Sequence, residues 1–168
     1  MTRVSDTPDA QLWYALNRLE INYWWEVDLN GGLTAHEFYL ADGLYRVGEN
    51  RFCGHDEIRA FYGWRARRGP TTARHLISNL QVFAADDWHA RLVAVLSVFR
   101  CNGRPPIQNE RPPSLIADVI GECTRVEDGT WRYRSHAVRP VFVGSDIPLS
   151  LTVDSQVILA KRGKREIS

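Results

Sequence analysis

The sequence predicts an α+β domain in which three N-terminal helices pack on one face of a strongly curved antiparallel sheet. Apolar residues recur at helical spacing up to residue 68, whereas from residue 74 onward they alternate with polar residues as in strands. A run of helices followed by a run of strands is typical of α+β domains, whose helices gather on one face of the sheet. Because three helices cannot fill the concave face of a strongly curved sheet, we expect a pocket between the two layers.

The first helix is predicted to begin at Thr7 and to end at Asp28. Thr7 fits the cap position and Pro8 the first helical position, while Asn30 and the two glycines after it stop the helix. One stripe carries the apolar and aromatic side chains: Leu12, Trp13, Leu16, Leu19, Ile21, Tyr23 and Trp24.

The elements expected next are a short helix over 33–40, strands over 43–47 and 51–53, and a third helix over 54–68. Thr34 and Glu37 have the spacing of a capping box at the start of the short helix. Gly48 lies in the turn between the two short strands, which favours a hairpin.

Four longer strands are expected over 74–83, 88–101, 115–126 and 131–143, with a Pro- and Asn-rich loop over 102–113. Strict alternation in the first of them places His75, Ile77 and Asn79 on one face and Leu76 and Ser78 on the other. The predicted domain covers residues 1–143, and residues 144–168 form a C-terminal extension whose docking site the sequence does not indicate.

Composition narrows the range of partners. The net charge of the 168-residue chain is +1, so no strong field attracts nucleic acid or an acidic membrane. The short cluster Arg65, Arg67 and Arg68 is interpreted as a solvated face. Six Trp, six Tyr and six Phe indicate a ring-rich core, a ring-lined pocket, or both.

Cysteine usage and the ends of the chain favour a cytoplasmic protein. Three cysteines without metal-ligand spacing indicate neither a disulfide framework nor a zinc site. No apolar run is long enough to span a membrane, and the polar start lacks a signal-peptide stretch. The sequence contains no dinucleotide or phosphate-binding glycine loop, so we expect neither a cofactor nor a metal.

Several local motifs occur in a characteristic order. An aromatic helix ending at Asp28 is followed by GHDEI at 54–58, RHLISN at 74–79 and DGTWR at 128–132. In this order, over about residues 9–143, the chain resembles the nuclear-transport-factor-2-like superfamily, specifically its SnoaL-like branch, which includes scytalone dehydratase. The resemblance implies a cystatin-like cone that encloses one pocket.

The resemblance also implies a candidate catalytic pair. In the dehydratase-like members an Asp at the end of the first helix meets a His on the first long strand, and Asp28 and His75 match these positions. Val27 occupies a position where those enzymes place a tyrosine. His136 falls where a related dehydrochlorinase directs an arginine into the pocket, which makes His136 a candidate pocket residue.

An Asp–His pair suits proton transfer. A neutral imidazole whose second nitrogen donates to a carboxylate can act as a general base near neutral pH. Tyr45, Ser78 or Asn79 are candidates to donate a hydrogen bond to an oxyanion, and the remaining wall is expected to be aromatic. Its candidate side chains are Trp13, Trp24, Phe38 and Phe61. The alternative is that His75 is a hydrogen-bonded structural residue without a catalytic role.

The predicted function is a cofactor-free lyase or isomerase of the dehydratase type, acting on a small hydrophobic cyclic or aromatic molecule. Two alternatives stay open: a non-catalytic small (β) subunit of a ring-hydroxylating dioxygenase, and a small-molecule-binding protein without turnover. Apolar residues on both sides of the strand around Leu92–Val98 further predict a homodimer or homotrimer.

Overall fold

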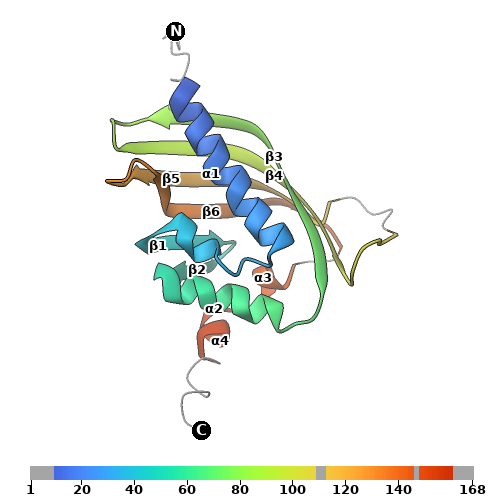
Figure 1. Ribbon diagram of the computed structural model, residues 1–168. Helices are drawn as coiled ribbons and strands as arrows, with labels where there is room; N and C mark the ends of the chain where they lie inside the picture. Colours follow the sequence, from blue (N-terminus) through green and yellow to red (C-terminus); the bar gives the residue numbers. More distant parts are fainter. Residues whose placement is uncertain (1–9, 109–112, 146–147, 161–168) are drawn as a thin grey trace.

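The computed structural model describes residues 10–108, 113–145 and 148–160. Six strands form one sheet in the order β2-β1-β6-β5-β4-β3 (Figure 1). Their bounds are β1 Tyr39–Val47, β2 Asn50–Cys53, β3 Thr71–Ala84, β4 His89–Asn102, β5 Leu115–Arg125 and β6 Trp131–Val143. The four long strands lie where the sequence predicts them, because their apolar alternation matches the pleat of a sheet with one buried face.

Two α-helices precede the long strands. Helix α1, Ala10–Leu29, crosses the sheet, and α2, Gly54–Ala66, lies beside β1 and β2 (Figure 1). The expected start of α1 at Thr7 and Pro8 lies outside the described residues. Two short helices follow the last strand: α3, Leu149–Thr152, and α4, Ser155–Ala160.

The expectation of three N-terminal helices is wrong. Between α1 and β1 the chain forms only a single 3₁₀ turn, η1, Ala35–Phe38. The Thr34 side chain makes no capping hydrogen bond, and its backbone N–H donates instead to Oε1 of Glu26 at 2.7 Å. The predicted capping box is therefore replaced by a carboxylate from α1, and the segment enters β1 six residues after Leu33.

The sheet is mixed, whereas the sequence predicted an antiparallel one. Strand β1 pairs with β6 in parallel, and every other neighbouring pair is antiparallel. Parallel neighbours need a long connection. Here β2, α2 and the meander from β3 to β5 separate β1 from β6 along the chain, so no tight turn constrains their directions.

A β-bulge changes which residues of β3 face the helices. The register with β4 shifts between Ser78 and Gln81, and Asn79 adopts a positive φ of 54°, which Asn tolerates better than most residues. Ala73 and Val82 are both buried although they are nine positions apart, an odd offset that strict alternation would place on opposite faces. The predicted strict alternation therefore holds only up to Ser78, and beyond it every side chain changes face.

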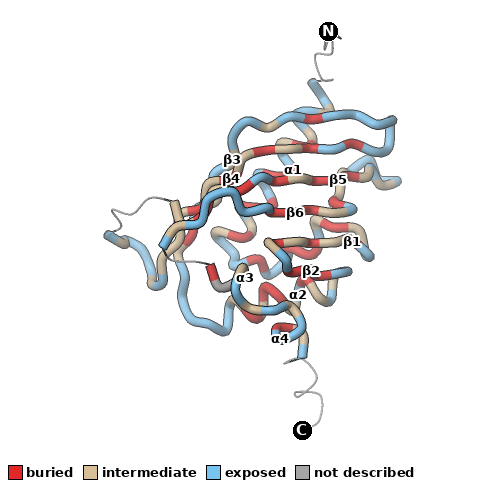
Figure 2. The backbone as a smooth tube through the Cα atoms, turned by 180° about the vertical axis from the view of Figure 1, so that it is seen from behind, coloured by how far each residue is buried: buried red, intermediate tan, exposed pale blue. Residues whose placement is uncertain are grey.

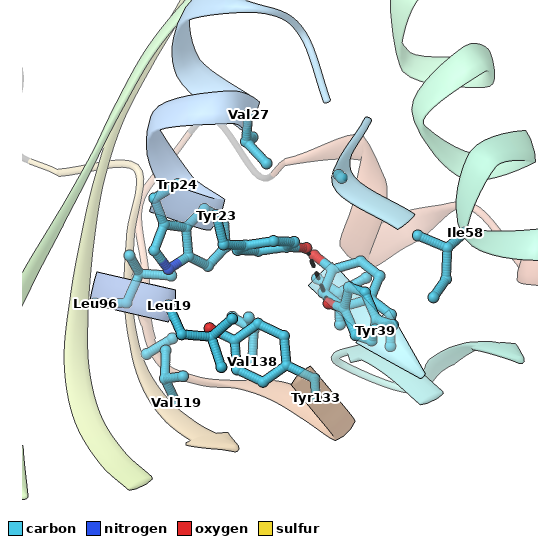
Figure 3. Packing of buried hydrophobic residues seen from close by; sticks show 14 of the residues in the cluster. Leu19, Tyr23, Trp24, Val27, Tyr39, Ile58, Leu96, Val119, Tyr133 and Val138 are labelled. Carbon is cyan, nitrogen blue, oxygen red and sulfur yellow. Dashed lines mark hydrogen bonds between the residues drawn. The ribbon is translucent and has the colours of Figure 1, made fainter. Parts of the chain in front are cut away.

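Aromatic side chains fill the core between α1 and the sheet (Figure 3). Tyr23 of α1 lies edge-on to the rings of Tyr39 and Tyr133 in the strands, and Trp24 lies edge-on to Tyr23. From behind, buried positions are interleaved with half-buried and exposed positions along the strands (Figure 2). The sheet thus has one core face and one partly covered outer face.

Two findings concern the cysteines and the search for a membrane-spanning helix. Cys53, Cys101 and Cys123 are free thiols. No described helix combines the length and the apolar character that a membrane-spanning helix requires.

The segment after β6 docks on α2 and β2 through one buried amide. Nδ2 of Asn50 donates to the carbonyl oxygens of Ser150 and Val153 at 2.8 and 2.7 Å, and its Oδ1 accepts from the N–H of Ser155 at 2.7 Å. Ile158 of α4 is buried. The sequence did not indicate this docking site, which places the start of α3 beside the interior of the cone.

Replacing Asn50 should detach this segment. We expect Asn50→Ala to lower the free energy of unfolding by about 2–3 kcal/mol, because three buried hydrogen bonds lose their partner. Denaturant unfolding measures the change. The matched control Asn102→Ala, at an exposed strand end, should shift it by less than about 0.5 kcal/mol. Equal effects of both variants would contradict the role of Asn50.

Candidate functional site

A cavity of about 280 Å³ lies between the end of α1, the end of α2, the concave side of the sheet and the start of α3. Apolar walls come from both layers. They include Trp24, Val27, Phe61, Trp64, Leu96, Val98 and Val138. Polar side chains enter the wall at three places: Asp28 with His75, Tyr45, and a group of arginines. A cavity that combines apolar walls with convergent polar groups is typical of a small-molecule site.

The last turn of α1 positions Asp28. Helix α1 stops where the N–H groups of Asn30 and Gly32 both bond the carbonyl oxygen of Glu26. Gly32 adopts a φ of +79°, and a Cβ at this position would lie 2.1 Å from the Tyr62 ring. Glycine is therefore required for the chain to turn closely against α2. An acid at a helix C-terminus is disfavoured by the helix dipole, so Asp28 needs specific donors.

His75 supplies both of those donors. Its backbone N–H donates to Oδ2 of Asp28 at 2.8 Å, and its Nδ1 lies 2.5 Å from Oδ1. The two side chains are only 8% and 9% exposed. Because a carboxylate accepts, Nδ1 carries the proton and Nε2 carries the lone pair. Nε2 forms no hydrogen bond with any described residue, which leaves it available at the cavity wall.

Trp24 contacts the face of the His75 ring. Its indole stacks on the His75 ring at a centroid distance of 4.2 Å and an interplanar angle of 12°. The indole Nε1–H donates to Oε1 of Glu20 at 2.6 Å. Glu20, Trp24 and Asp28 are spaced four residues apart on α1, so one helical face orients the imidazole by a stack and by a hydrogen bond.

Glu20 belongs to a second acid–imidazole pair that is fully buried. It accepts from Tyr133 at 2.6 Å and lies 3.2 Å from Nε2 of His136. Nδ1 of His136 lies 3.2 Å from the Tyr39 hydroxyl, so both nitrogens of this ring have partners inside the protein. His136 is therefore part of the core hydrogen-bond network and does not line the cavity.

A series of phenols extends this network towards the cavity. The Tyr39 hydroxyl donates to Tyr23 at 3.1 Å (Figure 3). The Tyr23 and Tyr62 hydroxyls lie 2.5 Å apart. Burial, followed by the charge of Tyr62, raises the pKa of Tyr45 well above 10, so its hydroxyl is protonated at neutral pH. Tyr45 is also one of the residues that line the cavity.

Burial is the largest single influence on the pKa of His75 and on that of Glu20, but it sets the direction of the shift only for His75. It lowers the pKa of His75 below its usual 6.5; the hydrogen bond and charge of Asp28 oppose this, and the charge of Arg65 adds to the lowering. Burial alone would raise the pKa of Glu20, but the charge and hydrogen bonds of His136, Tyr133 and Trp24 outweigh it, and the net shift is below 4.5. At neutral pH His75 is therefore neutral and Glu20 is ionised.

Five of the residues predicted from the sequence line the cavity: Trp24, Asp28, Tyr45, Phe61 and His75. The other four do not. Trp13 is 37% exposed near the far end of α1, Phe38 packs edge-on to Tyr23 in the core, Asn79 is turned outward by the bulge, and His136 is enclosed by the Glu20 network. Ser78, the other candidate donor, is exposed.

Sequence reasoning missed the arginines and Glu20. Arg65, Arg68 and Arg100 line the cavity. Arg68 is exposed, as expected for a solvated face, whereas Arg65 is half-buried, which the interpretation as a solvated face did not anticipate. Arg65 lies one turn after Phe61 on the buried side of α2, a spacing that was available as a signal. Glu20 lies four residues before Trp24 and eight before Asp28, and an acid at that spacing beside an apolar stripe indicates a buried partner.

No three His, Cys, Asp or Glu side chains converge in a metal-ligand arrangement within the described ranges. The polar groups of the cavity instead combine one imidazole base, one phenol and several guanidinium donors. This set suits proton transfer and the binding of an oxygen-rich group.

Acid should destabilise the fold in two steps. The folded protein favours neutral His75, so the unfolded chain binds that proton more readily, and stability should fall as pH decreases below 6.5. Glu20 has a lowered pKa, so its contribution should be lost below 4.5. Denaturant unfolding across the pH range measures both steps.

The His75→Gln variant isolates the first step. It should flatten the loss of stability that begins below 6.5, whereas His89→Gln, which changes an exposed turn histidine, should retain it. Parallel curves for the wild type and His75→Gln would show that another group titrates.

The sequence matches no protein-family model and no curated protein. Solved structures do match. A Catenulispora acidiphila protein in complex with S-DNPA has a TM-score of 0.67 and 16% identity, over 79% of this chain and 95% of that one. A candidate scytalone dehydratase from Novosphingobium aromaticivorans has a TM-score of 0.63 and 18% identity, over 78% and 85% of the two chains. A Nostoc punctiforme protein of unknown function with a cystatin-like fold has a TM-score of 0.65 and 16% identity, over 83% and 96%. These matches show that the chain has a cystatin-like fold.

Proposed function

We propose that the chain is a cofactor-free lyase or isomerase of the dehydratase type, acting on a small cyclic or aromatic molecule. One observation carries the proposal: Asp28 holds His75 by two hydrogen bonds at the wall of a cavity, and the second ring nitrogen remains without a protein partner. The contrast with His136, whose two nitrogens are both engaged, favours a chemical over a structural role for His75.

His75 is the proposed general base. Its Nε2 takes a proton from a carbon next to a carbonyl, and the Asp28 carboxylate stabilises the imidazolium that forms at Nδ1 and Nε2. Because the pKa of His75 is lowered, the ring is in its neutral, basic form at physiological pH. Stacking on Trp24 fixes the plane of the ring without occupying either nitrogen.

The remaining electrons and protons balance within the cavity. As the C–H bond breaks, its electron pair forms the new C=C bond, and the C–O bond on the neighbouring carbon breaks. The hydroxyl group leaves as hydroxide, takes the proton from His75 and departs as water. The protonated hydroxyl of Tyr45 is assigned as the donor to the substrate carbonyl, where negative charge develops. No cofactor is required by this sequence of steps.

The substrate class follows from the wall. Aromatic and branched apolar side chains suit a flat ring and exclude water from the base. Two structural neighbours support this class, since one is a candidate scytalone dehydratase and the other was solved with the small molecule S-DNPA. A cytoplasmic location, inferred from the composition, stays an expectation.

Neutralising Asp28 should abolish most of the activity. With a β-hydroxytetralone as probe, we expect Asp28→Asn and His75→Gln each to lower kcat by roughly 10²–10⁴-fold, because the first loses the tautomer and the second the base. The ultraviolet band of the naphthol product measures turnover. In the wild type, kcat/KM should rise with pH through a midpoint below 6.5, where His75 loses its proton.

Two matched variants control for the substitutions. Asp118→Asn and His89→Gln change exposed residues away from the cavity and should retain activity. Turnover by Asp28→Asn at the wild-type rate would contradict the proposed pair. Binding of hydroxyketones without any turnover would contradict catalysis and favour the binding-protein alternative.

A homodimer or homotrimer also stays a prediction. The outer face of the sheet carries half-buried apolar residues at Val93, Val95, Ile116 and Ile120, and covering them would stabilise an assembly. Light scattering at micromolar concentration should give a mass above that of one chain, and Val95→Asp should reduce it. A wild-type monomer at that concentration would overturn the prediction.

A further inference from the structure

Three guanidinium groups lie at one end of the cavity. Arg65 and Arg68 come from the last turns of α2 and beyond, and Arg100 comes from β4. Their side chains line the same cavity that contains His75. This places up to three positive charges at the wall of the cavity.

Within the described part of the chain, no carboxylate lies at ion-pair distance from these three groups. Arg65 lies over the Tyr62 ring at 5.5 Å and Arg68 over the Trp64 ring at 5.0 Å. Arg100 has only long contacts of 3.5 Å, to the Thr71 hydroxyl and the Asn102 side-chain oxygen.

The carboxylate that lines the cavity does not pair with the three arginines either. Asp28 is the one carboxylate among the lining residues, and both of its oxygens are engaged by His75. Among the described residues, no protein anion therefore pairs with the three guanidinium groups.

These charges also act on one another. Burial lowers the pKa of Arg100, and the charges of Arg65 and Arg68 lower it further. Gathering like charges at a partly desolvated site destabilises the protein unless an anion offsets it. Arginine is well suited to that task, because its planar fork binds carboxylate and phosphate oxygens in pairs.

We propose that the natural ligand carries an anionic oxygen group, such as a carboxylate, which binds to Arg65, Arg68 and Arg100 while its ring occupies the apolar part of the cavity near His75. This inference rests on the proposed function for the identity of the reacting end, and it adds the chemical class of the other end. Aromatic stacking on Tyr62 and Trp64 holds two of the guanidinium groups in place before the ligand arrives, which reduces the entropy lost on binding.

The geometry also gives the ligand a direction. The arginines belong to the end of α2 and the adjacent part of β4, whereas Trp24, Asp28 and His75 belong to the end of α1 and to β3. A cyclic acid held at the first group would extend its ring towards the second. The anionic group would thus act as an anchor and not as the reacting centre.

Matched probes test this inference without any turnover. Calorimetric titration should show that 2-naphthoate and 2-naphthyl phosphate bind roughly tenfold or more tightly than neutral 2-naphthamide at low ionic strength. The preference should shrink as salt screens the charges. Tighter binding of naphthoate than of naphthyl phosphate would identify a carboxylate as the anionic group, and the reverse order would identify a phosphate.

Arginine variants assign the effect to this site. Arg65→Gln and Arg100→Gln should each weaken naphthoate binding by roughly three- to tenfold and leave naphthamide binding almost unchanged. Arg134→Gln removes an equal charge from an exposed position outside the cavity and should change neither. Unfolding curves of each variant confirm that it is folded.

Three results would overturn the inference: equal binding of naphthoate and naphthamide, no binding of either, or an equal effect of Arg65→Gln and Arg134→Gln. The experiments can contradict this inference without contradicting the proposed function, and the reverse. A chain that prefers naphthoate but dehydrates no hydroxyketone would fail the proposed function alone. A chain that dehydrates a neutral hydroxytetralone but shows no preference for naphthoate would fail this inference alone.

Discussion

The pair of hydrogen bonds between Asp28, in the last turn of α1, and His75, on β3, is the interaction on which the rest of the structure depends. One carboxylate, at a helix end where the dipole disfavours it, accepts both the backbone N–H and the Nδ1–H of His75. The bond fixes how far α1 extends across the concave face, and it is also the bond that sets the tautomer of the imidazole. The position of the helix and the chemistry of the cavity therefore cannot vary independently.

The same face of α1 contacts two histidines, one enclosed in the core and one at the wall of the cavity. Glu20, Trp24 and Asp28 share that face; Glu20 serves His136 and Asp28 serves His75. Both pairs combine a carboxylate with an imidazole, yet the first is enclosed by tyrosines and completes every hydrogen bond within the protein. The second ends at the cavity with one nitrogen unpaired among the described residues. The two histidines differ in their hydrogen bonds: Nε2 of His75 has no partner among the described residues, whereas both nitrogens of His136 have one. Burial and an acidic partner are common to both.

Much of the fold could be predicted from periodicity, because the buried stripe of α1 and the alternation of the long strands record which face is covered. The Asp28–His75 contact could be anticipated from a resemblance in spacing. The failures have local physical causes. A hydrogen bond from the Thr34 N–H to the Glu26 carboxylate replaced the expected cap at Thr34. A bulge at Asn79 reversed the faces of the last part of β3, which no alternation pattern reveals. Arg100 could not be assigned to the cavity because the strand pairing that brings it beside α2 is a long-range property.

The charge of Arg65 links the two ends of the cavity. It contributes to lowering the pKa of His75 and also that of Arg100. An anionic group bound at Arg65 would offset that charge, so the pKa of His75 would rise and the imidazole would become a stronger base once the ligand is in place. A neutral ring of the same shape would fill the apolar space without this effect. Basicity would then depend on the ligand's charge, so an uncompensated arginine beside a catalytic histidine would favour the reaction of an anionic substrate over that of a neutral one.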